Sequence, residues 1–333
     1  MNSPLTIQSL LFRLIRDKIP PQLSYVHEIA ELLNISYDSA YRRIREEKEL
    51  TLDEFRNLVT HYGLSADALF ETTQLNILFT PLSFQKNKAS FLEWLHQVLN
   101  EIRSLAALED KIVMYSAKDI PIFHYFQFKE ISLFKEFLWL KTLFKLPEYN
   151  EKLFSVKESS DEVFQIGQQI LHYSVKIPTI EIWNDETITN LLQQVKYYWE
   201  SGFFASEEDF WSLCDKIEEW IKHIRKQAEL GYKFIYGNEP EGLDDTFKLF
   251  YNDFILGDNT VLMLAKDRKI AFTTYNFIHL LSTNNPGFCQ EIEDFMHTLT
   301  QKSVLISKVS AKERNNFFNR MLERVYKLKT IVE

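Results

Sequence analysis

The sequence has little cysteine and little glycine. Its two cysteines, Cys214 and Cys289, lie far apart in the chain, so we expect no disulfide framework and infer a reducing compartment. Its eight glycines form neither G-x-G-x-x-G nor G-x-x-x-x-G-K-[ST], which excludes the usual phosphate-binding loops.

Other chemical signatures are also missing. C-x-x-C and H-E-x-x-H do not occur, and the eight histidines are dispersed, so no metal site is expected. No uninterrupted apolar run is long enough to cross a membrane, and the N-terminal residues lack a signal-peptide layout. We therefore expect a cytoplasmic protein that makes no membrane contact, has no cofactor and is not an enzyme.

The chain is long and apolar enough for more than one domain. It has 333 residues, 45% of them hydrophobic, and a net charge of −9. The hydrophobic content can fill real cores, whereas the net negative charge repels nucleic acid overall. The 27 phenylalanines favour an aromatic core over a ligand cage.

Residues 28–45, EIAELLNISYDSAYRRIR, predict two short helices joined by a tight turn. Ile29, Leu32 and Leu33 share one face of the first helix. Asn34 tolerates a positive φ and can end that helix, and Ser36 is a good N-cap for the second. Two short helices with such a turn form a helix-turn-helix.

The flanking sequence predicts three more helices. An apolar stripe from Ile7 to Ile15 indicates a helix that Pro20-Pro21 ends. Thr51 and Glu54 form a capping box that opens a helix ending at Gly63, and Ser65 can cap a last short one.

These five expected helices within residues 1–70 resemble the lambda-repressor-like (Cro-type) domain. They are more closely similar to the BetR-like N-terminal domain of bacterial one-component transcriptional regulators. The residues that carry the match are Ala30, Asn34, Ile35, Ser36, Ala40 and the run Tyr41-Arg42-Arg43-Ile44. Asn34 replaces the usual turn glycine, and Ala40 is smaller than the valine often found there. The resemblance covers residues 1–70 only.

The resemblance implies a sequence-specific, DNA-binding transcriptional regulator, which we expect to be a homodimer on double-stranded DNA. The recognition helix Tyr37–Arg45 would enter the major groove, with Arg42 forming a bidentate contact to guanine. Tyr37, Asp38 and Tyr41 would face the bases, and Arg43, Arg45, Lys48 and the helix start at Ser24 would contact phosphates. The full set of expected DNA-binding residues is Ser24, Ser36, Tyr37, Asp38, Ser39, Tyr41, Arg42, Arg43, Arg45 and Lys48.

Charge leaves an alternative open. Residues 1–70 contain eight basic and ten acidic side chains, although Arg42, Arg43, Arg45 and Lys48 cluster within seven positions. A basic footprint is the usual sign of DNA binding. The alternative is a protein–protein interaction adaptor whose helix-turn-helix-like domain does not bind DNA and docks a partner instead. Separately, the arginines can lie on a solvated helix face with Glu46, Glu47 and Glu49 as partners, but groove contact is favoured.

The rest of the chain predicts a second domain. We expect domains at 1–72 and 88–333, joined by a linker or extended segment at 73–87. A long amphipathic helix after Ser90 would either pair with its twin in a dimer or lie on its own domain. The fold class expected is mostly α: a five-helix bundle, then an α+β domain of several helices with a small antiparallel sheet.

Its sheet is expected from Lys111–Ala117 and from a meander at 233–275 with a hairpin turn at Lys266-Asp267-Arg268. Helices are expected at Glu162–Tyr173, Glu186–Ser201, Glu207–Leu230, Asn276–Ser282, Phe288–Thr300 and Ala311–Lys329.

One polar cluster in the second domain lies at a strand end. Tyr115-Ser116-Ala117-Lys118-Asp119, with His124 nearby, can touch an effector, but a solvated turn with a Lys–Asp pair is favoured. Cys289 is interpreted as an inert buried cysteine rather than a reactive thiol. We expect this domain to mediate oligomerisation or to sense a small-molecule or protein effector.

Overall fold

The computed structural model describes residues 6–19, 24–69, 77–82, 87–157, 161–254, 257–266, 268–276 and 279–330. The chain forms two compact units, Met1–Leu78 and Phe79–Glu333, called here the first and second unit. Each is described by itself. The expected helix stop at Pro20-Pro21, the central residue Asp267 of the expected hairpin turn, and most of the expected linker lie outside the described residues.

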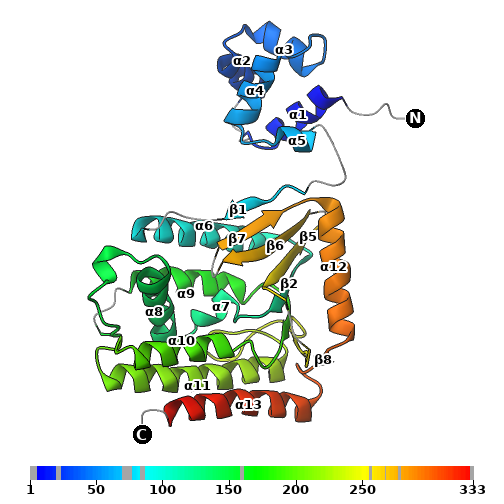
Figure 1. Cartoon of the computed structure of the whole chain (residues 1–333). Helices are drawn as coiled ribbons and strands as arrows, with labels where there is room; N and C mark the ends of the chain where they lie inside the picture. The colour runs from blue at the N-terminus through cyan, green and yellow to red at the C-terminus, as the bar shows by residue number, and fades with distance from the viewer. Residues whose placement is uncertain are drawn as a thin grey trace. The chain divides into compact units, whose positions relative to one another are not determined.

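The first unit consists of short helices (Figure 1). Their bounds are Ile7–Arg16 (α1), Tyr25–Leu33 (α2), Tyr37–Ile44 (α3), Leu52–His61 (α4) and Ala66–Leu69 (α5). The predicted helix caps are confirmed in their local geometry. Asn34 ends α2 in the left-handed conformation, with φ 51° and ψ 50°, and the Ser36 hydroxyl accepts the backbone N–H of Ser39. Thr51 and Glu54 form the expected capping box at the start of α4.

The core of the first unit joins α1 to the helix pair. Its fully buried residues include Leu11 and Ile15 of α1, Ile29 of α2, Ala40 of α3 and Leu58 of α4. The Gln8 side chain adds a polar tie, because it donates to the carbonyls of Arg43 and Lys48 and accepts the Leu50 N–H. These bonds fix the turn that follows α3.

In the described part of the second unit, eight strands form one mixed sheet. The strands are Thr80–Leu82 (β1), Lys111–Ala117 (β2), Thr179–Trp183 (β3), Phe247–Tyr251 (β4), Thr260–Ala265 (β5), Arg268–Asn276 (β6), His279–Thr283 (β7) and Val304–Leu305 (β8). Their order is β1-β7-β6-β5-β2-β3-β4-β8. β2, β3 and β4 are mutually parallel, and the other neighbouring pairs are antiparallel.

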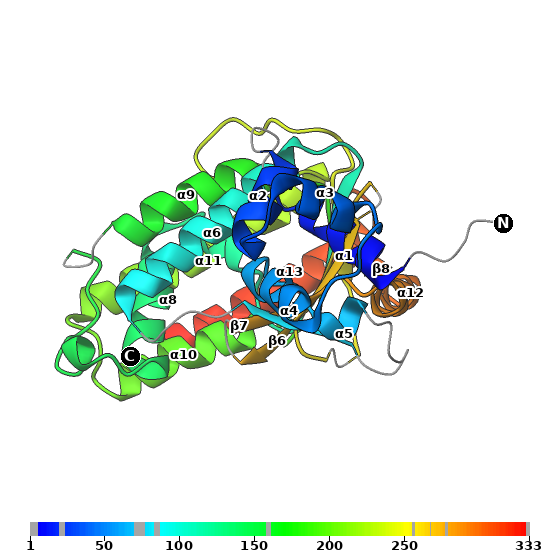
Figure 2. The same cartoon turned by 90° about the horizontal axis from the view of Figure 1, so that it is seen from above.

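Helices cover both faces of this sheet (Figures 1 and 2). They are Lys88–Ala107 (α6), Ile122–Tyr125 (α7), Lys129–Leu138 (α8), Glu162–Ser174 (α9), Thr189–Glu200 (α10), Glu207–Leu230 (α11), Pro286–Gln301 (α12) and Ala311–Lys329 (α13). A π-helical turn, Trp139–Leu143, follows α8, and a 3-10 turn occupies Pro147–Tyr149.

Side-chain alternation along β3 separates the two cores. Ile182 packs with Met296 of α12 on one face, whereas Trp183 faces the large helical layer on the other. Period-two alternation is what a strand covered on both sides requires. The apolar face of α6 also lies in the helical layer, through Phe91, Leu95 and Leu99. Two roles were left open for this helix, pairing with its twin in a dimer and packing on its own domain. The structure shows the helix packed on its own domain.

The predicted fold class is wrong. The chain is an α/β protein with an eight-stranded mixed sheet in its described residues, rather than a mostly-α protein with a small antiparallel sheet. The strand β3 was missed. β7 lies where a helix at Asn276–Ser282 was expected, and 233–237 forms no strand. Pairing with β6 overrides the ambiguous local pattern of β7, since a short apolar run does not distinguish strand from helix.

Candidate functional site

The exposed face of α3 carries most of the residues expected to contact DNA. Tyr37 is 57% exposed and Tyr41 is 42% exposed, and Asp38 and Arg42 are also exposed. Arg45 lies over the Tyr41 ring, with its guanidinium carbon 5.4 Å from the ring centroid.

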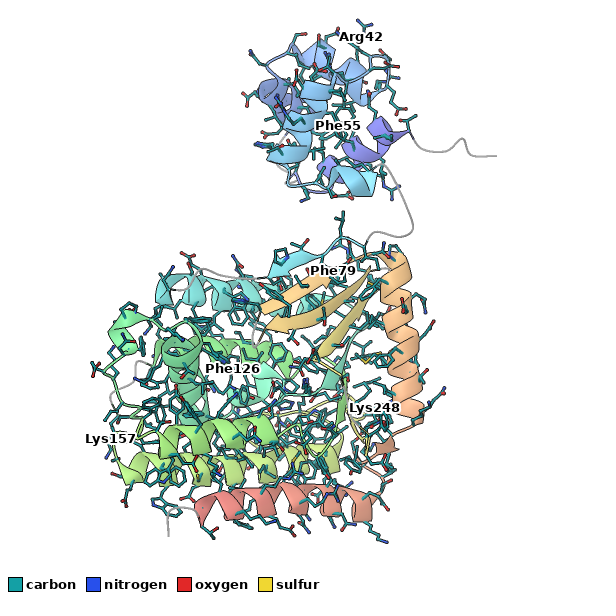
Figure 3. All side chains as sticks on the ribbon, in the orientation of Figure 1. Arg42, Phe55, Phe79, Phe126, Lys157 and Lys248 are labelled. Atoms are coloured by element: carbon teal, nitrogen blue, oxygen red, sulfur yellow. The ribbon has the colours of Figure 1, made fainter. Side chains whose placement is uncertain are left out.

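Arg42 points away from the core of the first unit (Figure 3). Its side chain is exposed and makes no ion pair with any residue that the structure describes. Its carbonyl accepts the N–H groups of Glu47 and Lys48 at 2.8 and 3.2 Å. This compact turn returns Lys48 toward the C-terminal end of α3.

Arg43 takes a different role from the one predicted. It is 4% exposed, and its Nε and Nη2 atoms donate to the two carboxylate oxygens of Glu54 at 3.1 and 2.7 Å. Its Nη1 donates to the carbonyl of Ser39. Because its donors are directed inward, we do not retain Arg43 as a phosphate contact.

The remaining candidates divide between capping and exposed positions. Ser36 and Ser39 bond to each other at the start of α3, so Ser36 serves as a cap. Ser24 is the exposed N-cap residue of α2, and its side chain makes no capping bond. Arg45 lies 3.7 Å from Glu47, with both side chains about half exposed. An exposed pair of this kind contributes little stability.

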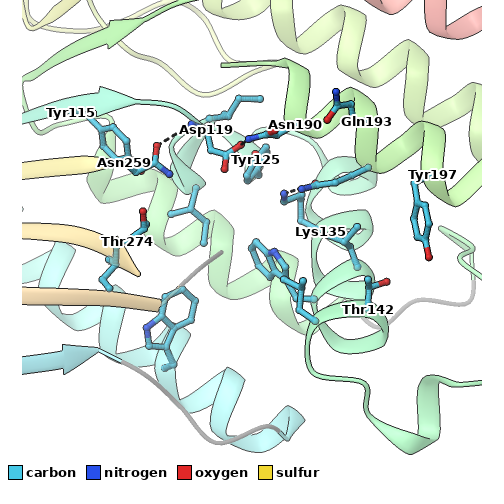
Figure 4. A pocket seen from close by; sticks show the side chains of 18 residues that line it. Tyr115, Asp119, Tyr125, Lys135, Thr142, Asn190, Gln193, Tyr197, Asn259 and Thr274 are labelled. Atoms are coloured by element: carbon cyan, nitrogen blue, oxygen red, sulfur yellow. Dashed lines mark hydrogen bonds between the residues drawn. The ribbon is translucent and has the colours of Figure 1, made fainter. Parts of the chain in front are cut away.

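The second unit contains a cavity of about 420 Å³ beyond the carboxyl end of β2 (Figure 4). Crevices at the carboxyl ends of parallel strands are common ligand sites in α/β folds. The wall combines residues from several elements: Trp94, Tyr115, Asp119, Ile120, Ile122, Tyr125, Lys135, Leu138, Trp139, Thr142, Leu143, Asn190, Gln193, Gln194, Tyr197, Asn259, Thr274 and Leu280. The π-helical turn contributes Trp139, Thr142 and Leu143 to it, and such turns are frequent at functional sites.

Lys135 is the buried cation of this cavity. It is 7% exposed, and its Nζ donates to Gln194 Oε1 at 2.8 Å. The same Nζ lies 4.8 Å from the centroid of the Tyr125 ring and 5.6 Å from that of Trp139. Burial lowers the pKa of Lys135 to about 8, while the charge of Asp119 acts in the opposite direction.

Asp119 is the carboxylate of the cavity. Its Oδ1 accepts the Asn190 side-chain amide at 2.6 Å, and its backbone N–H donates to Asn259 Oδ1 at 2.9 Å. Two amides from distant parts of the chain therefore fix the turn after β2. The carboxylate is half-buried at the cavity wall (Figure 4).

Only some residues of the polar cluster at the end of β2 line the cavity. Tyr115 and Asp119 line the cavity, whereas Lys118 is exposed and pairs with Asp258 at 2.8 Å. His124 is buried elsewhere, with its Nε2 2.9 Å from Glu181. Sequence reasoning therefore found two wall residues, although it favoured a solvated turn.

Sequence reasoning missed Lys135, Asn190 and Gln194. Lys135 lies within the strongly apolar run SLFKEFLWLKTLFKL. A lysine inside such a run is a usable signal, because lysine is almost never fully buried without a partner. The two amides carry no comparable signal, since only the fold brings α10 to this cavity.

Within the described ranges, no group of His, Cys, Asp or Glu side chains could hold a metal ion. Cys214 and Cys289 are both buried and free, and burial raises the pKa of each thiol. Among the helices the structure describes, none is both long and apolar enough to span a bilayer.

Comparison of the chain with protein-family models, with curated proteins and with solved structures finds no match. The function must therefore be inferred from the geometry of the two units.

Proposed function

We propose that this protein is a sequence-specific DNA-binding transcriptional regulator of the cytoplasm, in which α3 reads the major groove. One observation carries the proposal: α3 follows a left-handed turn at Asn34 and presents Tyr37, Tyr41 and Arg42 to solvent while Ala40 is buried beneath. This is the arrangement in which a helix-turn-helix offers side chains to base edges.

The roles follow from side-chain chemistry. Arg42 is the candidate for a bidentate contact to guanine, because its planar fork matches the O6 and N7 acceptors. Tyr37, Asp38 and Tyr41 face bases or thymine methyl groups. Arg45 and Lys48 contact phosphates, and DNA displaces Glu47 from Arg45. Ser24, at the start of α2, offers a backbone phosphate contact.

Selection from random DNA tests this proposal. The full-length protein is incubated with a random duplex pool, and the bound fraction is sequenced over several rounds. We expect a defined motif and an affinity that falls as salt rises. Because each first unit has two cations that contact phosphates, the slope of log K against log salt concentration should be about −2 for each bound first unit. A pool that stays random in sequence contradicts the proposal.

We also propose that the protein binds DNA as a homodimer, since symmetric half-sites compensate for the few contacts of one small unit. The apolar face of α6 is buried within its own unit, so another surface would form the dimer. Sedimentation of the free protein and of its complex on the selected DNA gives the stoichiometry. A monomer in both samples refutes this part.

A second function, protein–protein adaptor, is favoured by the burial of Arg43 and the Arg45–Glu47 pair. Both reduce the cationic charge available to DNA. Salt separates the two functions. Binding to DNA weakens as salt rises, with the slope given above, whereas docking of an apolar partner does not.

A further inference from the structure

The cavity of the second unit contains both signs of charge in a largely apolar wall. Among its lining residues, Lys135 is the cation and Asp119 the carboxylate. Neither makes an ion pair with any residue that the structure describes. Each is bonded instead to a neutral side-chain amide, Gln194 or Asn190. Buried charges usually have a partner of opposite charge.

Donor capacity at Lys135 also remains. An ammonium group has three N–H donors, and one is directed to Gln194. The rings of Tyr125 and Trp139 stabilise the ammonium by cation–π contact, but they do not accept conventional hydrogen bonds. The cavity therefore offers a cation with donors to spare.

The rest of the wall is suited to an apolar body. Trp94 and Trp139 supply aromatic surface, and Leu138 and Leu280 supply aliphatic surface. Small-molecule sites typically combine such a wall with a few polar groups that fix orientation, in clefts of roughly 300–1,000 Å³. At about 420 Å³, the cavity lies in this range.

We propose that this cavity binds a small amphipathic zwitterion, such as an aromatic or large aliphatic amino acid. Lys135 pairs with its carboxylate, Asp119 pairs with its ammonium group, and the aromatic and aliphatic wall encloses its side chain. Binding itself is independent of DNA. Control of DNA binding by this ligand rests additionally on the proposed function.

Matched probes test the charge pairing. L-Phenylalanine carries both charges, 3-phenylpropionate lacks the ammonium group, and phenethylamine lacks the carboxylate, while all three share a phenyl ring. Isothermal titration of the full-length protein should give the tightest binding for L-phenylalanine. The two probes that lack one charged group should each bind about tenfold or more weakly, which is the effect of one lost charge contact. L-Tryptophan and L-leucine extend the series to other side chains.

Two variants assign the charges. Lys135→Met should reduce the affinity for L-phenylalanine to that of phenethylamine for the wild type. Asp119→Asn should reduce it to that of 3-phenylpropionate. Lys118→Met is the matched control and should leave affinity unchanged, because Lys118 is exposed, pairs with Asp258 and does not line the cavity. Circular dichroism verifies that each variant is folded, and Lys135→Gln replaces Lys135→Met if that variant is not.

Three results would overturn the proposal. One is absence of binding by all three amino acids at millimolar concentration. Another is equal affinity for the three phenyl probes, which would indicate an uncharged ligand. The third is unchanged L-phenylalanine affinity in folded Lys135→Met. None of these measurements includes DNA, so a failure here is distinct from a failure of the proposed function.

Discussion

Arg43 of α3 and Glu54 of α4 form a two-bonded ion pair in which the guanidinium is buried and the carboxylate is 16% exposed. Glu54 also accepts the backbone N–H of Thr51, so one carboxylate both caps α4 and holds α3. The pair fixes the orientation of the helix that we propose enters the major groove. Arg42, one position earlier, is free to point outward.

Replacing Arg43 should loosen the first unit. Arg43→Met leaves the Glu54 carboxylate without its partner, and we expect a loss of about 3 kcal/mol, as for other buried pairs with one member removed. Hydrogen exchange in the full-length protein measures it, with exchange in α3 and α4 about 100-fold faster. Arg56→Met is the matched control, because the Arg56–Asp53 pair is more than two-thirds exposed. Equal protection in both variants would contradict a structural role for Arg43.

Arg42→Ala should weaken binding to the selected DNA by about 1–3 kcal/mol and relax the preference at one base pair. The preference should change at one position because the variant loses a bidentate contact to one base. Loss of charge alone would weaken binding to all sequences about equally. Arg13→Ala removes the same charge from an exposed position on α1 and should leave the sequence preference intact. Titration and repeated selection measure both effects. An unchanged motif in Arg42→Ala would remove this residue from the contact set.

Gly167→Ala should destabilise the second unit. A Cβ at this position of α9 would lie 2.2 Å from Cδ1 of the buried Phe126 ring. We expect overpacking to cost about 1–3 kcal/mol, more than the helix-propensity gain of at most about 1 kcal/mol. Gly287→Ala in α12 is the control, since its nearest neighbour lies at an ordinary 3.4 Å. The Gly287 variant should be neutral or slightly stabilised, and a neutral Gly167 variant would show that Phe126 can move.

Denaturant unfolding followed by tryptophan fluorescence measures the stability of the second unit alone. All six tryptophans belong to this unit, because none precedes Trp94.

Glu136 should make the second unit less stable as pH rises. Burial raises the pKa of Glu136 to about 7, although Lys88 at 3.5 Å opposes the shift. The folded state therefore retains a proton that the unfolded state releases near its ordinary pKa of about 4.5. Stability falls between these two pH values. Glu136→Gln removes this term, so unfolding at pH 5 and pH 8 should differ less than in the wild type. The exposed Glu148→Gln should retain the wild-type difference.

Local structure in the first unit could be predicted because its determinants are adjacent in sequence. Asn34, Ser36 and the Thr51–Glu54 box each act within four residues, and all adopt the expected geometry. The burial of Arg43 could not be predicted in this way. Its partner Glu54 lies eleven positions away, and the glutamates expected as partners were Glu46, Glu47 and Glu49.

The sheet of the second unit depends on contacts that no local pattern encodes. β3 is only five residues long, and β2 and β4 flank it from positions more than sixty residues away in each direction. The long helices Glu207–Leu230 and Ala311–Lys329 have the predicted bounds, because many turns of periodicity define them. Likewise, Tyr115 and Asp119 could be identified at a strand end, but only the tertiary fold brings them together with Lys135 and Asn190 in one cavity.

The three-residue strand β1 has a consequence for handling this protein. It pairs with Leu280–Ser282 of β7, and just before it the Phe79 ring packs edge-on against Phe288 at 5.3 Å (Figure 3). A fragment that starts at Lys88 would lack β1 and Phe79. The backbone of β7 would then be an unpaired template for intermolecular strand addition. A fragment that starts before Phe79 would keep β1 and Phe79 and should remain dispersed at high concentration.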